Sequence, residues 1–137
     1  MIINNKIVEI KKMFDVFDNP IDKYTQIIEI GKKNKGLNDK YKNNENRIFG
    51  CTSLAWIKTI KKNNLYYIDI DSDTFIVKGL LSILQQIING ATKEEVLKIE
   101  IQDILKSIGL EESITSQRTN GFLSAMNKIK GQININE

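Results

Sequence analysis

Among its 137 residues the chain has no histidine, one cysteine, one proline and one tryptophan, and these absences exclude several kinds of chemistry. Without histidine there is neither a Ser-His-Asp or Cys-His catalytic arrangement nor an imidazole metal ligand. A single cysteine cannot form an internal disulfide or supply the several thiolates of a zinc or iron–sulfur site. The lone thiol of Cys51 is therefore either a packed side chain or a nucleophile that works without a histidine base.

Basic residues only slightly outnumber acidic residues, 20 against 17, which gives a net charge of +3. Two of the basic residues, Arg47 and Arg118, are arginines. Nucleic-acid binding usually needs a basic stripe with guanidinium groups or stacking aromatics, so we expect no nucleic-acid partner. We also find no apolar run near the roughly 20 residues of a membrane helix, and no signal-peptide core. The sequence thus predicts a cytoplasmic protein without a membrane span, in a reducing compartment where a free thiol persists.

Apolar residues with helical spacing occupy both ends of the chain. Asn19 and Pro20 are typical of a helix N-cap and first helical residue, and Asn89-Gly90 is typical of a helix end. Thr92 and Glu95 have the spacing of a capping box. The expected helices cover residues 3–17, 20 to about 33, 76–88, a short stretch after Thr92, 102–108 and 115–130.

Three short apolar segments between these helices favour strands, at residues 47–49, 54–57 and 65–70. Asn63-Asn64, before the last segment, is a turn signal. We therefore predict an α+β fold in which a small three-stranded antiparallel sheet is flanked by helices. No repeat and no linker divides the sequence, so residues 1–137 are expected to form a single domain with a frayed tail at 132–137.

Cys51 is the first candidate for chemistry. A free cysteine is most often a small buried hydrophobe. Against that reading, Gly50 permits a tight turn, Thr52-Ser53 suits an exposed turn, and the end of a strand projects its residues. A thiolate there is stabilised by turn N–H groups or a nearby cation, and the thiolate fraction governs reactivity.

The other candidates lie at the starts of helices. In Asp71-Ser72-Asp73 we expect Ser72 or Asp73 to cap the following helix, with the remaining acid free to face a partner. The segment is a weak match to a paired-carboxylate site, and it has too few oxygen ligands for calcium or magnesium. Arg118 opposes the dipole of the last helix, which indicates that its guanidinium binds a carboxylate of a partner or of the chain's own loop.

Three blocks of sequence stand out: NRIFGCTSLAW at 46–56, DSD at 71–73 with IVKGL at 76–80, and SQR at 116–118 with Gly121 and Met126. Together these blocks resemble the SufE/CsdE family of sulfur acceptors for cysteine desulfurases. They cover nearly the whole chain, in order and at suitable spacing. Thr52 and Ala55 depart from the family, which often has glutamine and valine there.

The resemblance implies a SufE/IscU-like fold, a small sheet flanked by helices, in one SufE-like domain. It implies that Cys51 takes persulfide sulfur from a cysteine desulfurase of the SufS/CsdA kind, stimulates that enzyme, and passes the sulfur to an iron–sulfur scaffold of the SufBCD kind. The carrier itself would bind no cofactor or metal, since pyridoxal phosphate (PLP) stays on the desulfurase. Asp73 and Arg118 match family positions, which implies that they hold the Cys51 loop or dock the desulfurase.

Such a chain is a carrier rather than a stand-alone enzyme, and sulfur exchange needs neither metal nor histidine. Two other functions stay open. One is a redox sensor whose Cys51 reacts with peroxide and depends on an external thiol. The other is a scaffold or interaction module in which Cys51 only packs. The residues also leave open whether the chain forms a homodimer and what Thr52 contributes.

Overall fold

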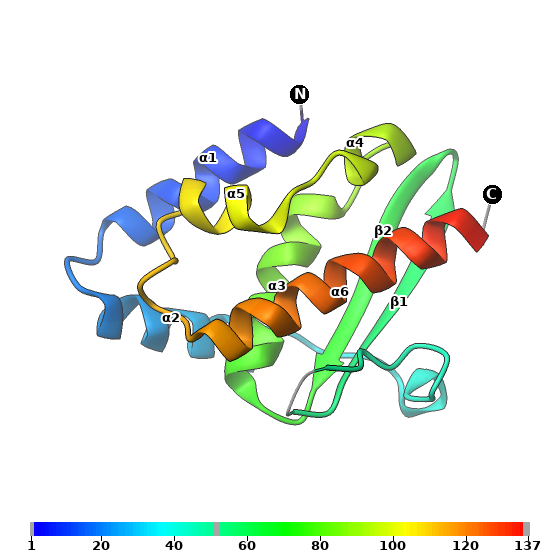
Figure 1. Ribbon diagram of the computed structural model, residues 1–137, viewed down its shortest axis with the longest axis horizontal. Coiled ribbons are helices and arrows are strands. Elements are labelled where there is room, and N and C mark those ends of the chain that lie inside the picture. The colour runs from blue at the N-terminus through cyan, green and yellow to red at the C-terminus, as the bar shows by residue number, and fades with distance from the viewer. Residues whose placement is uncertain (1, 51–52, 136–137) are drawn as a thin grey trace.

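The computed structural model describes residues 2–50 and 53–135, and it has the predicted α+β character. Figure 1 shows the β-hairpin along one side of the molecule, α3 and α6 against it, and α1, α2 and α5 farther away. Within these described residues, no helix is both long and apolar enough to cross a membrane. The elements are α1 (Ile2–Asp15), α2 (Pro20–Lys33), the 3-10 helix η1 (Asp39–Tyr41), β1 (Ala55–Lys62), β2 (Leu65–Ser72), α3 (Phe75–Ile88), α4 (Lys93–Leu97), α5 (Ile101–Ser107) and α6 (Ser116–Ile135).

Local capping chemistry sets several helix ends where the sequence predicts them. The Asn19 side chain accepts the N–H of Asp22 at 2.9 Å, and Pro20 begins α2. Thr92 and Glu95 form the capping box of α4. Such caps satisfy backbone donors that have no partner within the helix, which is why a few residues suffice to place these boundaries.

The sheet has two strands among the described residues, so the predicted third strand is wrong. β1 and β2 pair along their full length, and both turn residues, Asn63 and Asn64, have the positive φ that a two-residue hairpin turn needs. The segment 47–49 contributes only an isolated bridge from Arg47 to Trp56. In that bridge the Ile48 N–H donates to Ala55 O at 2.9 Å, and the Ile57 N–H donates to Asn46 O at 2.8 Å.

Side-chain amides occupy the outer edges of the hairpin, which explains why no further strand pairs there. The Gln132 amide of α6 donates to Ile57 O at 2.9 Å and accepts the Thr59 N–H at 3.0 Å, just beyond the bridge. On the β2 edge, Asn89 accepts the Ile68 N–H at 2.9 Å and Gln85 donates to Ile68 O at 2.8 Å. Each amide supplies the donor or acceptor that a neighbouring strand would supply.

The C-terminal helix is longer than predicted, so the frayed tail expected at 132–137 is wrong for residues 132–135. α6 continues to Ile135. Two residues account for the extension: Gln132 bonds to β1, and Ile133 is fully buried one turn after the buried Ile129. Residues 136 and 137 lie outside the described part of the chain.

The backbones of α2 and α3 touch where two glycines face one another. A Cβ on Gly79 would lie 1.9 Å from the Ile27 carbonyl oxygen, and one on Gly31 would lie 2.2 Å from the Phe75 carbonyl oxygen. Helix axes can approach this closely only where no side chain intervenes. Because ten of the 14 residues of α3 are buried, this crossing fixes the helix around which the core is built.

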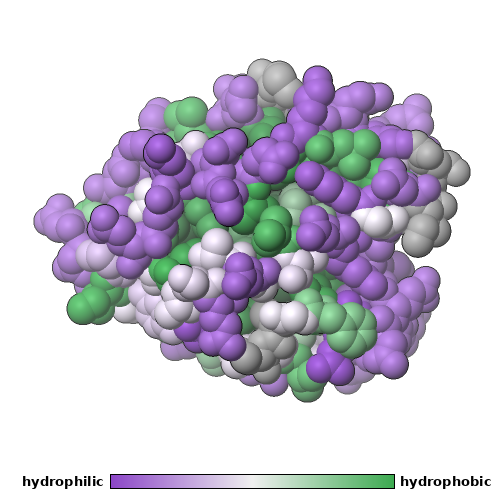
Figure 2. All heavy atoms as spheres, in the orientation of Figure 1, coloured by the Kyte–Doolittle hydropathy of each residue, from purple (hydrophilic) through white to green (hydrophobic). Residues whose placement is uncertain are grey.

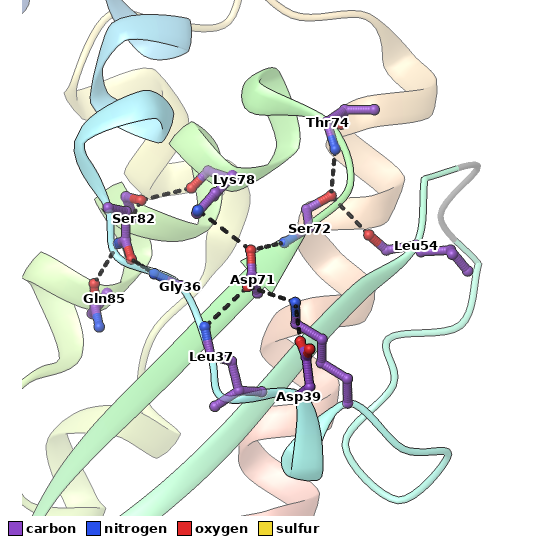
Figure 3. A network of polar contacts seen from close by, with 12 residues as sticks. Gly36, Leu37, Asp39, Leu54, Asp71, Ser72, Thr74, Lys78, Ser82 and Gln85 are labelled. Carbon is purple, nitrogen blue, oxygen red and sulfur yellow. Dashed lines mark hydrogen bonds and ion pairs between the residues drawn. The ribbon is translucent and has the colours of Figure 1, made fainter.

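Buried Asp71 ties the loop after α2 to the junction of β2 and α3 (Figure 3). Its carboxylate accepts the N–H groups of Leu37 at 3.0 Å and Ser72 at 2.8 Å. It also pairs with the ammonium groups of Lys42 at 3.1 Å and Lys78 at 3.5 Å. Burial alone would raise the pKa of Asp71, but these hydrogen bonds and cations outweigh it and lower the pKa. Asp71 is thus a structural hub rather than a free acid.

Replacing Gly79 with alanine should lower the free energy of unfolding by about 3 kcal/mol, because the new methyl group meets backbone that cannot move aside. Urea unfolding followed by circular dichroism measures the change. Gly131→Ala is the matched control: it is also a helical glycine, but nothing lies within 4 Å of its Cβ position. We expect that control to gain up to about 1 kcal/mol. Equal losses in both variants would contradict the close crossing.

Asp71→Asn should lower the free energy of unfolding at neutral pH by about 2 kcal/mol, because Lys78 loses its counter-charge and Lys42 keeps only Asp39. A lowered pKa in the folded state stabilises the protein above the unfolded carboxyl value of about 4 and loses this effect as pH falls through the folded value. The difference between wild type and variant should therefore shrink below about pH 4. Asp69→Asn, two residues earlier on β2, should change stability by less than about 0.5 kcal/mol.

Candidate functional site

The predicted nucleophile Cys51, with Thr52, lies outside the described residues, and the site is built from the residues on either side. Before it, Ile48 is buried while Phe49 is 60% exposed. Gly50 has φ +91°, in the left-handed region that favours glycine, and the rest of the turn predicted there falls on residues 51 and 52, outside the described residues. Its Cβ position lies 3.1 Å from the Ser124 hydroxyl, which places this turn against α6.

After residues 51 and 52, the chain is hydrogen-bonded to the residues that lead into α3. The Asp73 carboxylate accepts the Leu54 N–H at 3.0 Å, and the Asp73 N–H donates to Leu54 O at 3.0 Å. The Ser72 hydroxyl donates to the same carbonyl at 2.8 Å, and the hydroxyls of Ser53 and Thr74 lie 3.0 Å apart. Leu54 is thus held by both the side chain and the backbone N–H of the same acid.

These contacts overturn the prediction that Ser72 or Asp73 caps α3. The N-cap is Thr74, and its side chain makes no capping hydrogen bond. Ser72 and Asp73 are turned instead to the backbone of Leu54, which offers both an N–H and a carbonyl across the hairpin end. Asp73 therefore lies beside the segment that the sequence singled out, by a contact that local capping rules do not predict.

Arg118 lies in the first turn of α6, as predicted, with its guanidinium carbon 5.8 Å from the centroid of the Tyr24 ring of α2. Its buried Nε has no hydrogen-bond partner among the described residues. No carboxylate from residues 2–50 or 53–135 forms an ion pair with it, so the predicted carboxylate partner does not come from this part of the chain. The structure also records no ion pair between Arg118 and Asp73 there.

Arg118 and Ile48 help to line a small apolar cavity beneath the segment that leads to Cys51. The cavity measures about 20 Å³, which is roughly the space of one water molecule and too little for a small-molecule substrate. In the described part of the chain, no three acidic side chains approach closely enough to hold a metal ion. The lining residues are Ile48, Val77, Leu80, Leu81, Arg118, Gly121 and Phe122.

Four exposed apolar side chains, here named the apolar rim, adjoin these contacts. Phe49 and Leu54 lie on either side of residues 50–53 and are 60% and 40% exposed. Phe75, the first residue of α3, is 52% exposed, and Leu123, next to the Ser124 that approaches Gly50, is 42% exposed. In Figure 2 most of the visible face is hydrophilic, and hydrophobic atoms gather near its centre and lower edge. Large exposed apolar groups on a polar surface mark a place for protein contact. Sequence reasoning missed the rim, because helical or strand spacing alone assigns such residues to the core.

Comparisons with known proteins agree with this architecture. A solution structure of a hypothetical protein from Thermus thermophilus has the same fold, with a TM-score of 0.77 and 17% identity over 95% of this chain and 94% of that one. An uncharacterized SufE-like protein of Rhizobium meliloti is 33% identical over 123 residues, covering 87% of this chain and 88% of the relative.

Two longer relatives carry more specific names. The cysteine desulfuration protein SufE of Plasmodium falciparum is 32% identical over 132 residues, and this chain matches 52% of its length. The chloroplastic/mitochondrial SufE-like protein 1 of Arabidopsis thaliana is 32% identical over 123 residues, a third (33%) of its length. Organellar relatives leave the cytoplasmic location of this chain a prediction. The SufE family model, described as an Fe-S metabolism associated domain, matches residues 8–133, and the chain therefore belongs to the SufE family.

Proposed function

We propose that the chain is a sulfur acceptor in Fe–S metabolism, which receives persulfide sulfur on Cys51 from a PLP-dependent cysteine desulfurase and stimulates that enzyme. The observation that carries the proposal is the way the segment around the only cysteine is held. Gly50 turns against α6, and Leu54 is fastened to Asp73 at the start of α3. A short segment that is fastened at Leu54 and closely bordered by α6 at Gly50 suits a group that must enter a partner's active site.

The chemistry requires no cofactor on this chain. The Cys51 thiolate attacks the outer sulfur of the desulfurase persulfide, and a new S–S bond forms while the old one breaks. The desulfurase cysteine leaves as a thiolate, and Cys51 then carries the persulfide. The oxidation level travels with the transferred sulfur, so no external oxidant or reductant is consumed. The same exchange, directed at an acceptor thiol, passes the sulfur on to an iron–sulfur assembly scaffold of the SufBCD kind.

The apolar rim supports docking around this segment. Its four side chains are exposed in the free chain, and covering them on a partner would release apolar surface from water. In this proposal Asp73 is a positioning residue, because it bonds to Leu54 rather than to any reacting atom. Arg118 is half-buried and has no carboxylate partner among the described residues, and the rest of its guanidinium would bind a partner's carboxylate on docking.

Incubation with desulfurase and L-cysteine should add the mass of one sulfur atom to the wild-type chain, and the addition should reverse with a thiol reductant. Cys51→Ser should gain no sulfur, because the chain has no other cysteine. Intact mass spectrometry measures both. Equal labelling of Cys51→Ser would overturn the proposal. Rapid gain of oxygen from peroxide, together with no gain of sulfur from the desulfurase, would favour the redox sensor instead.

Asp73→Ala should slow sulfur transfer to Cys51 by about fivefold, since one hydrogen bond of about 1 kcal/mol holding Leu54 is lost. Asp73→Asn keeps an oxygen acceptor and should recover most of the rate. Single-turnover transfer, measured by mass at saturating desulfurase, separates this effect from weaker docking. Asp18→Ala, which removes an exposed acid between α1 and α2, is the control and should transfer at the wild-type rate. A wild-type rate in Asp73→Ala would remove Asp73 from this role.

A further inference from the structure

A second surface feature is a groove lined by residues of η1, β1 and the C-terminal half of α6. These three elements lie on the right-hand side of Figure 1. It has a volume of about 730 Å³ and includes no residue of the apolar rim. Its charged lining residues are Lys40, Lys58 and Lys128, one from each of its three walls, and Glu45. We name it the basic groove.

The three lysines of the basic groove outnumber its one acid, and none of them is engaged in an ion pair within the described chain. Lys40, Lys58 and Lys128 form no ion pair with any carboxylate of residues 2–50 or 53–135. Lys42 behaves differently, since it pairs with both Asp39 and Asp71 at 3.1 Å. Lys40, Lys58 and Lys128 thus leave the groove with an excess of positive charge over its single carboxylate, Glu45.

Lys58 and Lys40 converge on one aromatic ring. Their ammonium groups lie 3.4 Å and 4.9 Å from the centroid of Tyr41. Lys58 does so although Asp69 is its cross-strand neighbour in the hairpin. The lysines also lower the pKa of the Tyr41 phenol, chiefly through the hydrogen bond from Lys58, as a positive local potential requires. Two ammonium groups at one ring give this part of the groove a positive potential that attracts an anion.

The walls also offer neutral hydrogen-bonding groups. Asn43 and Asn127 line the groove and are exposed, and the Asn127 side chain makes no hydrogen bond to the described residues. An amide presents a donor and an acceptor together, which matches a peptide bond, whereas a phosphate offers acceptors only. Gln132 at the floor is already committed to β1 and lends rigidity instead.

We propose that the basic groove binds an extended acidic segment of a protein partner, with its carboxylates on the lysines and its backbone on the asparagine amides. The volume exceeds what a single carboxylate or phosphate fills. A nucleic acid fits less well, because the groove has no arginine and its one aromatic ring already holds the Lys58 ammonium. Binding of such a segment does not depend on sulfur transfer.

The test uses the full chain and a fluorescein-labelled peptide of alternating glutamate and serine. Binding followed by fluorescence anisotropy should weaken markedly between about 0.1 M and about 1 M salt, where the screening length falls from about 10 Å to about 3 Å. In ¹⁵N-labelled protein the side-chain amide signals of Asn43 and Asn127 should shift, while that of Gln132 stays in place. The same peptide with glutamine for glutamate should not bind.

Lys58→Gln and Lys128→Gln should each weaken peptide binding about threefold, and the double variant about tenfold. Lys62→Gln is the matched control, since Lys62 is an exposed lysine of the same strand outside the groove. An equal loss in Lys62→Gln would show attraction by net charge only and would overturn the groove. Absence of peptide binding, or tighter binding of a single-stranded oligonucleotide that the groove variants abolish, would also overturn the proposal. Cys51→Ser should bind the peptide as tightly as the wild-type chain does. Peptide binding and sulfur transfer are therefore tested separately, and a failure of one does not imply a failure of the other.

Discussion

The direct backbone contact between α2 and α3 at Gly31 and Gly79 is the constraint on which the remaining structure depends. It lets α3 lie deep enough to bury apolar residues on nearly all of its faces, so that helices and hairpin pack around it. Because α3 follows β2 after two residues, its position also determines where Asp73 lies. A close packing contact at one end of the core thus places the residue that fastens Leu54 at the surface.

The hairpin stays two-stranded because helices satisfy its edges. Gln132 on β1, and Gln85 and Asn89 on β2, provide hydrogen bonds that further strands would otherwise provide. This has two consequences. The edges are protected from pairing with other chains, which is a hazard of exposed strands. The same amides also hydrogen-bond α6 to β1, and α3 and its C-cap to β2. The two helices next to the segment around Cys51 are therefore both held to the hairpin.

The surface carries two features of different chemistry, the apolar rim and the basic groove. The apolar rim borders the segment on either side of the only cysteine, and it suits a partner that covers it and excludes water. The basic groove uses lysines from three elements and suits an acidic partner through charges that remain hydrated and sensitive to salt. In the proposed function the chain would meet one protein to receive sulfur and another to deliver it, and two surfaces of different chemistry would suit two different partners.

The sequence by itself determined the α+β character, the helix caps at Asn19 and Thr92 and the turn at Asn63-Asn64. These features depend on residues close together in the chain, so short-range propensity and capping rules suffice. Only the tertiary structure decided that residues 47–49 make a bridge rather than a strand, that α6 continues through Gln132, and that Asp73 bonds to Leu54 instead of capping α3. In each of these cases a backbone group is satisfied by a residue far away in the sequence, and only the folded chain brings the two together.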